Sequence, residues 1–326
     1  MRKTLKCVII LPFVAATGVI QAQQPSAEQY PARPLRLIAP SSPGSGVDIV
    51  ARIYAQKLGE QLHQQVVVEN RAGAGANLGA EIAAHTAPDG YNLFIATPAH
   101  AINSSLYSKL KYSLLRDFAP VSLITTGEYV VVVHPSLPVH TVRELVRIAR
   151  SRPDALSYGS GGLGNATHLA VELFDSMAGI RMLHVPYKGS GPALVDLMSG
   201  EVQVMFANLT AGLPHVRTGR LRAIATTGEK RSPILPDVPT VSESGLPGYV
   251  VTSYYGILVP KGTPASIVTK LNAATVAAMS DSDIARRLSA EGAQPTSSTP
   301  KEFSAFLHRE IERWAKVVDA AGLRPH

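Results

Sequence analysis

The chain of 326 residues is long enough for two domains that each bury a hydrophobic core. Hydrophobic residues make up 45% of it and charged residues 17%, a balance that excludes an intrinsically disordered chain. The formal net charge is +7, yet basic residues are spread among acidic ones, whereas nucleic-acid-binding proteins cluster theirs, so we expect no nucleic-acid partner.

Residues 1–22 are typical of a secretory signal peptide. Three basic residues precede an apolar stretch over residues 7–20, which is too short for a membrane-spanning helix. We predict cleavage after Ala22, which makes the mature protein periplasmic. Cys7 is the only cysteine, so the mature chain would have none for a disulfide, a thiolate nucleophile or a metal site.

The mature chain alternates short strands with helices. The first unit is a buried strand at residues 35–39, a loop at 40–46, and a helix over 48–62 whose apolar residues recur at helical spacing. Further strands are predicted at residues 66–68, 91–96, 130–133, 156–158, 184–187, 202–206, 221–226 and 256–259. Further helices are predicted at residues 77–85, 141–151 and 167–178, and from Pro192, Pro264 and Pro300 onward. This alternation predicts an α/β fold with mainly parallel sheets.

The loops that follow the strands are rich in small residues. They include residues 40–46, 69–76, 97–103, 159–166 and 188–191. In open α/β sheets, ligands bind at the carboxyl ends of the strands, where helix N-termini present unpaired N–H groups. Glycines let a ligand approach the backbone closely, and hydroxyls add hydrogen-bond donors. Several such loops together predict a cradle for an anion.

The motifs do not support other chemistry. Residues 44–49 (GSGVDI) begin like a dinucleotide fingerprint but lack its third glycine, and no Gly-Lys-Ser/Thr run provides a phosphate loop. Ser160, His168 and Asp175 could be combined into a triad, but closeness in sequence is no sign of triad geometry. We therefore expect no catalytic residues, no metal site, no cofactor and no enzymatic activity.

Eight short runs are spread along the mature chain between residues 37 and 240. The most specific are VVENRAGAGANLG at residues 67–79, APDGYNL at 87–93 and HVPYKGSG at 184–191. The others are LIAPSSPGSGVDIVAR at 37–52, AINSSLY at 101–107, DFAPVSL at 117–123, SYGSGGLGNATHLA at 157–170 and LPDVPT at 235–240. In their order along the chain, the runs resemble the TctC/Bug family, the extracytoplasmic solute receptors of tripartite tricarboxylate transporters.

The resemblance implies a two-lobed, flytrap-like periplasmic binding protein of type II, each lobe a mainly parallel sheet flanked by helices. Residues 23–124 and 253–326 would form one lobe and residues 125–252 the other, with the hinge near residues 125 and 252. The family implies capture of a small carboxylate, which includes di- and tricarboxylates and amino or aromatic acids, for membrane permease subunits, and we expect a monomer. Two alternatives stay open. One is a periplasmic sensor that feeds a two-component system, and a more distant one is a hydrolase that uses the loop of Ser160.

The resemblance also implies how the ligand is held, which is by backbone N–H groups and small hydroxyls rather than by direct ion pairs. The implied first-lobe residues are Ser41, Ser42, Gly44, Gly73, Ala74, Thr97 and Ala99, and the second-lobe residues are Ser160, Gly164, Asn165, Thr167 and Asn208. The sequence departs from the family pattern at Ser41, often phenylalanine, and at Asn165, usually threonine or serine. Ala207 replaces a frequent aspartate, which argues against an amino-acid ligand whose ammonium would need that carboxylate.

Overall fold

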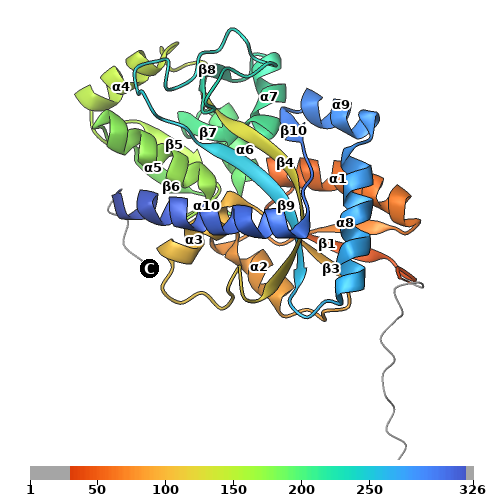
Figure 1. Cartoon of the computed structure of the whole chain (residues 1–326). Coiled ribbons are helices and arrows are strands. Elements are labelled where there is room, and N and C mark those ends of the chain that lie inside the picture. The colour runs from red at the N-terminus through yellow and green to blue at the C-terminus, as the bar shows by residue number, and fades with distance from the viewer. Residues whose placement is uncertain (1–29, 321–326) are drawn as a thin grey trace, which may run out of the picture.

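In the computed structural model, which describes residues 30–320, ten strands form one curled sheet with helices on both faces (Figure 1). The strands are β1 (Leu35–Ala39), β2 (Val66–Asn70), β3 (Asn92–Ala96), β4 (Phe118–Val133), β5 (Ser157–Ser160), β6 (Leu183–Pro186), β7 (Val204–Asn208), β8 (Arg222–Thr226), β9 (Thr252–Pro260) and β10 (Ala293–Pro295). The helices are α1 (Gly46–Leu62), α2 (Asn77–Ala84), α3 (Pro98–Leu106), α4 (Val142–Ser151), α5 (Ala166–Ala178), α6 (Ser190–Ser199), α7 (Leu209–Arg217), α8 (Ala265–Met279), α9 (Ser282–Ala290) and α10 (Pro300–Ala320), with a short 3-10 turn η1 (Ala74–Ala76). Within this part of the chain, no helix is long and apolar enough to cross a membrane.

Two strands, β4 and β9, join two halves of the sheet. Residues 118–128 of β4 pair with β9, which also pairs with β3. Residues 129–133 of β4 pair instead with β7 and β8. We call β1, β2, β3, β9, β10 and the first part of β4, with their helices, the terminal half, and the remaining strands with their helices the central half.

Parallel pairing between the named strands involves three strands in each half. In the terminal half β1 pairs in parallel with β2 and β3, and in the central half β5 pairs in parallel with β6 and β7. All neighbours of β4 run antiparallel to it. The sheet is therefore mixed rather than mainly parallel as expected, because the chain crosses between the halves on β4 and returns on β9 in the opposite direction.

Each half has a hydrophobic cluster on both faces of its sheet. In the terminal half, one cluster contains Tyr54 of α1 and Leu271 of α8, and the other contains Phe94 of β3 and Phe303 of α10. In the central half, one cluster is built around residues of α4, α5 and β7, and the other around residues of α6, α7 and β7. Helices covering both faces of a sheet are the expected α/β arrangement.

The C-terminal helix α10 packs on both halves. Its Phe303 and Leu307 belong to a terminal-half cluster, whereas Trp314 and Val318 belong to a central-half cluster. Figure 1 shows α10 lying across the middle of the molecule, in front of β4 and β9. The apolar face of α10 therefore packs on two hydrophobic clusters, one in each half.

Several boundaries differ from the predictions. The loop expected at residues 97–103 is mostly helix α3, because Thr97 and His100 form a capping box and Pro98 occupies the first turn. The strand expected at residues 130–133 is only the end of the 16-residue β4. Helix α6 starts at Ser190, two residues before the expected Pro192, and helices α7 and α9 were not expected. The predicted signal peptide lies outside the described residues.

Candidate functional site

A small cavity of about 40 Å³ lies between the two halves of the sheet. The terminal half contributes Pro40, Ser41, Ser45, Gly46, Val47, Thr97, Pro98, Ala99 and Tyr255, and the central half contributes Tyr129, Asn165, Ala166, Thr167, Ser190 and Asn208. None of these wall residues is a lysine, arginine, aspartate, glutamate or histidine. The walls are therefore polar but carry no charged side chain.

Four helices begin at this cavity. The N-terminal caps of α1, α3, α5 and α7 are Ser45, Thr97, Asn165 and Asn208, and all four line the wall. The first turn of a helix has N–H groups without intrahelical partners and carries the positive end of the helix dipole. Two helices from each half thus direct positive potential at one small space, an arrangement that favours an anion.

The terminal-half wall is held by a local hydrogen-bond network. The hydroxyls of Ser41 and Ser45 are 2.5 Å apart, and the side-chain amide of Asn70 donates to the carbonyl of Ser41 at 3.1 Å and to Asp48 at 3.0 Å. Burial opposes ionisation of Asp48, but hydrogen bonds from Arg52, Gly44 and Asn70 outweigh it and lower the pKa of Asp48. The ionised Asp48 thus fixes the loop, and the hydrogen bonds from these three residues compensate its negative charge.

The central-half wall is fixed by two asparagine caps. The Asn165 side-chain oxygen accepts hydrogen bonds from the backbone N–H and the hydroxyl of Thr167, both at 3.1 Å. The Asn208 side chain accepts from the N–H of Thr210 at 3.1 Å and donates to Ser253 in the terminal half at 3.0 Å. These bonds orient the amides and the Thr167 hydroxyl at the cavity.

The two halves touch around the cavity. The Tyr107 hydroxyl donates to the carbonyl of Leu163 at 3.1 Å, and the N–H of Gly191 donates to the hydroxyl of Ser42 at 3.3 Å. A Cβ atom added to Gly75 would lie 2.2 Å from the Leu163 carbonyl oxygen, so only glycine allows this approach. The two halves are therefore in contact around a small cavity, in a closed arrangement.

The structure brings half of the predicted ligand-binding residues to the cavity, namely Ser41, Thr97, Ala99, Asn165, Thr167 and Asn208. The other six do not line it. Ser42 forms a contact between the halves, Gly44 donates its N–H to Asp48, and Gly73 and Ala74 form the turn before α2. Gly164 packs against Asn103 and Tyr107, and Ser160 is fully buried. A ligand-binding role stays a prediction for all twelve.

Some wall residues were not predicted. Tyr129 and Tyr255 lie next to the crossing point on β4 and β9, where they pair with residues more than 75 positions away. Burial raises the pKa of both phenols, so they stay neutral. Ser45 was missed although it lies in the predicted loop and caps α1. Ala207, by contrast, belongs to a hydrophobic cluster and does not line the cavity.

Ser160 has a histidine partner that the sequence did not reveal. Its hydroxyl lies 2.6 Å from Nε2 of His184, whose ring stacks on His168 with centroids 4.2 Å apart. Burial, together with the nearby His168, lowers the pKa of His184 to about 4. The sequence-derived combination of Ser160, His168 and Asp175 is not formed, since Asp175 accepts from the N–H of Met182 instead. Because Ser160 is 0% exposed and does not line the cavity, this pair has the chemistry but not the accessibility of a nucleophile.

Among residues 30–320, no three histidine, cysteine, aspartate or glutamate side chains are grouped so that they could hold a metal ion.

Comparisons with known proteins identify relatives of the chain and of its fold. Residues 50–323 match the model of the tripartite tricarboxylate transporter family receptor, TctC. The chain is 37% identical to protein BugT of Bordetella pertussis over 99% of both chains. A solved structure of R. palustris Rpa4515 with adipate matches with a TM-score of 0.89 and 38% identity, covering 91% of this chain and all of that one. The periplasmic binding protein BugD matches with a TM-score of 0.89 and 31% identity, covering 91% of this chain and all of that one. The expected periplasmic-binding-protein fold is confirmed.

Proposed function

The chain belongs to the tripartite tricarboxylate transporter receptor family, and from this we propose that it captures a small dicarboxylate in the cavity between its halves. One observation carries the proposal. Four helix N-termini, two from each half, meet at a polar cavity without charged side chains. Backbone N–H groups there would bind a carboxylate by charge-assisted hydrogen bonds. The similar Rpa4515 was solved with adipate, a dicarboxylate.

We propose that the two halves act as the lobes of a flytrap. Residues 23–124 with 253–326 and residues 125–252 would be the lobes, with the hinge near residues 125 and 252, because β4 changes pairing partners after Glu128 and β9 begins opposite it at Thr252. Opening would admit the ligand, and closing would complete its binding site from both sides. A ligand that contacts both lobes binds the closed form better and shifts the population toward it.

The proposal includes the location and the transport role of the protein in the cell. The mature receptor would act in the periplasm and present its closed form to the membrane permease subunits of a tripartite tricarboxylate transporter. A strain that lacks the receptor should lose uptake of the ligand, whereas a sensor would leave uptake intact and change gene expression.

The direct test is a thermal-shift measurement on the mature protein with adipate, succinate, malate and citrate. A ligand at about 100 times its Kd should stabilise the native state by roughly 2.7 kcal/mol. Uncharged diamides of the same length serve as controls and should give no shift. The ligand should be recovered unchanged after prolonged incubation, since turnover would instead support an enzyme. Absence of a shift with every acid, in protein shown by mass spectrometry to carry no bound acid, would contradict the proposal.

A further inference from the structure

A second pocket lies on the opposite face of the same two crossing strands. It has a volume of about 420 Å³, and we call it the rear pocket. Glu128 and Tyr254 line it, whereas their chain neighbours Tyr129 and Tyr255 line the cavity. Successive side chains of a strand point to opposite faces, so the two sites are separated by the thickness of the sheet.

Three chain segments complete the walls of the rear pocket. Gly228, Lys230, Arg231 and Pro233 come from the segment after β8, Gly292 and Gln294 from the region of β10, and Phe306 and Glu310 from α10. Both halves of the molecule therefore contribute. The volume lies in the range of small-molecule sites, which is about 300 to 1,000 Å³.

Two polar atoms of this pocket are buried without a partner. Tyr254 is 2% exposed, and its hydroxyl has no hydrogen-bond partner among the described residues. The same holds for Oε2 of Glu128. Burial raises the pKa of Glu128, and hydrogen bonds to its carboxylate from Ser232, Thr226 and the backbone of Gly228 have the smaller, opposite effect. None of them completes a well-formed hydrogen bond to Oε2. Buried polar groups are normally paired, so this pair points to a ligand that supplies hydrogen bonds.

The neighbouring Glu310 does not need such a ligand. It accepts from the indole N–H of Trp314 at 3.2 Å and from Arg313 at 3.4 Å. The free acceptor capacity is therefore concentrated at Glu128 and Tyr254. A Cβ at Gly228 would lie 2.6 Å from Oε2 of Glu128, so this glycine leaves room for the carboxylate.

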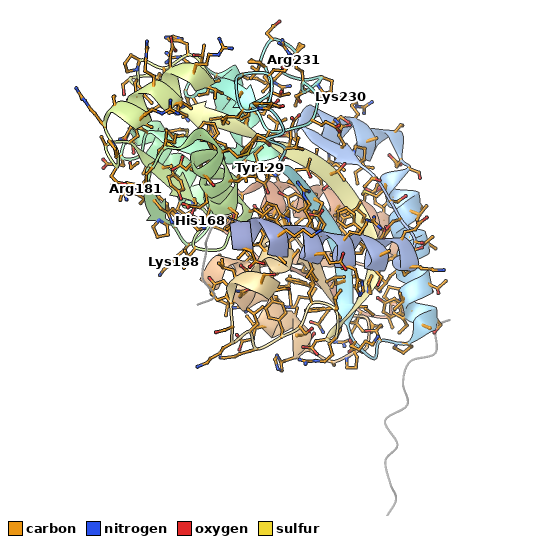
Figure 2. The ribbon with its side chains drawn as sticks, turned by 60° about the vertical axis from the view of Figure 1, so that its left-hand side comes forward. Tyr129, His168, Arg181, Lys188, Lys230 and Arg231 are labelled. Carbon is orange, nitrogen blue, oxygen red and sulfur yellow. The ribbon has the colours of Figure 1, made fainter. Side chains whose placement is uncertain are left out.

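A free positive charge also lines the pocket. Arg231 is engaged by Glu243 at 2.9 Å and by the carbonyl of Pro236, but Lys230 has no ion pair among the described residues. Figure 2 shows Lys230 and Arg231 next to each other, on the side of the molecule away from Lys188. The pocket thus presents an unpaired carboxylate oxygen and an unpaired ammonium group.

Aromatic side chains also line the pocket. The rings of Tyr254 and Phe306 meet edge to face with centroids 4.8 Å apart, and Pro233 adds apolar surface. A plain carboxylate would be repelled by Glu128, and a plain amine would leave Lys230 unpaired. Only a ligand with both charges and an apolar part matches all three features.

We propose that the rear pocket binds a zwitterionic amino acid with an apolar side chain. Its ammonium group donates to Glu128 and to the Tyr254 hydroxyl, its carboxylate pairs with Lys230, and its side chain packs on Phe306. This site is independent of the cavity and does not rest on the function proposed for it.

The test is calorimetric titration of the mature protein with leucine and with phenylalanine. Phenethylamine and 3-phenylpropanoate are matched probes, because each lacks one of the two charged groups of phenylalanine. We expect at least one of the two amino acids to bind, and both matched probes to bind at least tenfold more weakly than phenylalanine or not at all. The variants Glu128→Gln and Lys230→Gln should each weaken amino-acid binding by at least tenfold. Lys230 is exposed, so its variant tests the site even if Glu128→Gln folds poorly.

A variant of the cavity separates the two sites. Asn165→Asp adds a negative charge to the cavity and leaves the rear pocket unchanged, so amino-acid binding should persist in it. The proposal is overturned if neither amino acid binds at millimolar concentration. It is equally overturned if Lys230→Gln binds as the unaltered protein does, or if Asn165→Asp abolishes amino-acid binding.

Discussion

The cavity and the rear pocket share two strands but differ in how they present charge. The cavity side of β4 and β9 shows Tyr129 and Tyr255, and its positive potential comes from helix N-termini. The rear side shows Glu128 and Tyr254, and its charges are those of side chains. A shift of one residue along each strand therefore separates a site built on backbone dipoles from a site built on ionisable groups.

This difference has physical consequences. Backbone N–H groups do not titrate and are fixed by the helices that carry them, so they cost little reorganisation when an anion arrives. Side-chain charges depend on pH and on the mobility of long side chains such as Lys230. The cavity should thus be tuned by geometry and the rear pocket by protonation.

The largest effect is expected from Gly75→Ala. The added methyl group would collide with the Leu163 carbonyl and block closure, so affinity for the dicarboxylate should fall by roughly 100-fold, because the closed state becomes rarely populated. Gly179→Ala is the matched control. Its φ of 60° resembles the 62° of Gly75, but nothing lies within 4 Å of the added atom. Both variants should lose about 1 to 2 kcal/mol of stability from left-handed strain. Equal ligand affinities in titration calorimetry would show that closure does not depend on this contact.

A smaller effect is expected from Asn165→Asp. Aspartate caps a helix as well as asparagine does, so the thermal stability should stay within about 1 kcal/mol of the original. The added negative charge competes with the ligand carboxylate for the N-terminus of α5, so affinity should fall on the order of tenfold. Asn165→Ser, which caps without adding charge, should retain most of the affinity. An unchanged Kd in the aspartate variant would place the carboxylate elsewhere.

The smallest effect concerns pH. The cavity walls contain no group that titrates between pH 6 and about 8.5, since burial raises the pKa of Tyr129 and Tyr255, so dicarboxylate affinity should be flat in that range. Amino-acid binding at the rear pocket should instead weaken as pH falls through the pKa of Glu128, which burial raises above 4.5. Titrations at several pH values of both ligand types check this contrast.

The raised pKa of Glu128 also affects the stability of the protein. Because the native state holds the Glu128 proton more tightly than the unfolded chain does, stability should decrease as pH rises from about 4.5 through the native pKa. Glu128→Gln should remove this slope, which chemical denaturation at a series of pH values would reveal. A slope that persists in the variant would assign it to another group, such as Asp175, whose pKa burial raises to about 7.

Local signals predicted the fold well. The bounds of β1 were predicted correctly, and the Thr141 and Thr299 caps start α4 and α10 near the expected residues, because capping depends on residues three positions apart. Helix α3 was missed because its box uses His100 in place of glutamate. Most of β4 was missed because Pro120 and Gly127 resemble strand breakers. Pairing with β9, more than 120 residues away, overrides this local preference.

The predicted residues of the candidate site lie in or next to the loops that follow strands. Ser41, Asn165 and Thr167 follow strands in small-residue loops, which sequence reasoning can recognise. Tyr129 and Tyr255 lie on crossing strands, and the Ser160 contact with His184 joins two strands, so both features depend on tertiary pairing. The rear pocket was not predicted for the same reason, since its walls come from five separate parts of the chain.

The position of β9 has a consequence for the order in which the chain can fold. In the sheet, β9 lies between β3 and β4, although 118 residues separate the end of β4 from the start of β9. The strands β1 to β3 therefore cannot join β4 until residue 260 has emerged from the ribosome or the export channel, whereas β7 and β8 can pair with the end of β4 earlier, and β5 can pair with β6 and β7. During vectorial emergence, the middle of the chain can fold first. The edge of β3 stays unpaired until β9 has emerged.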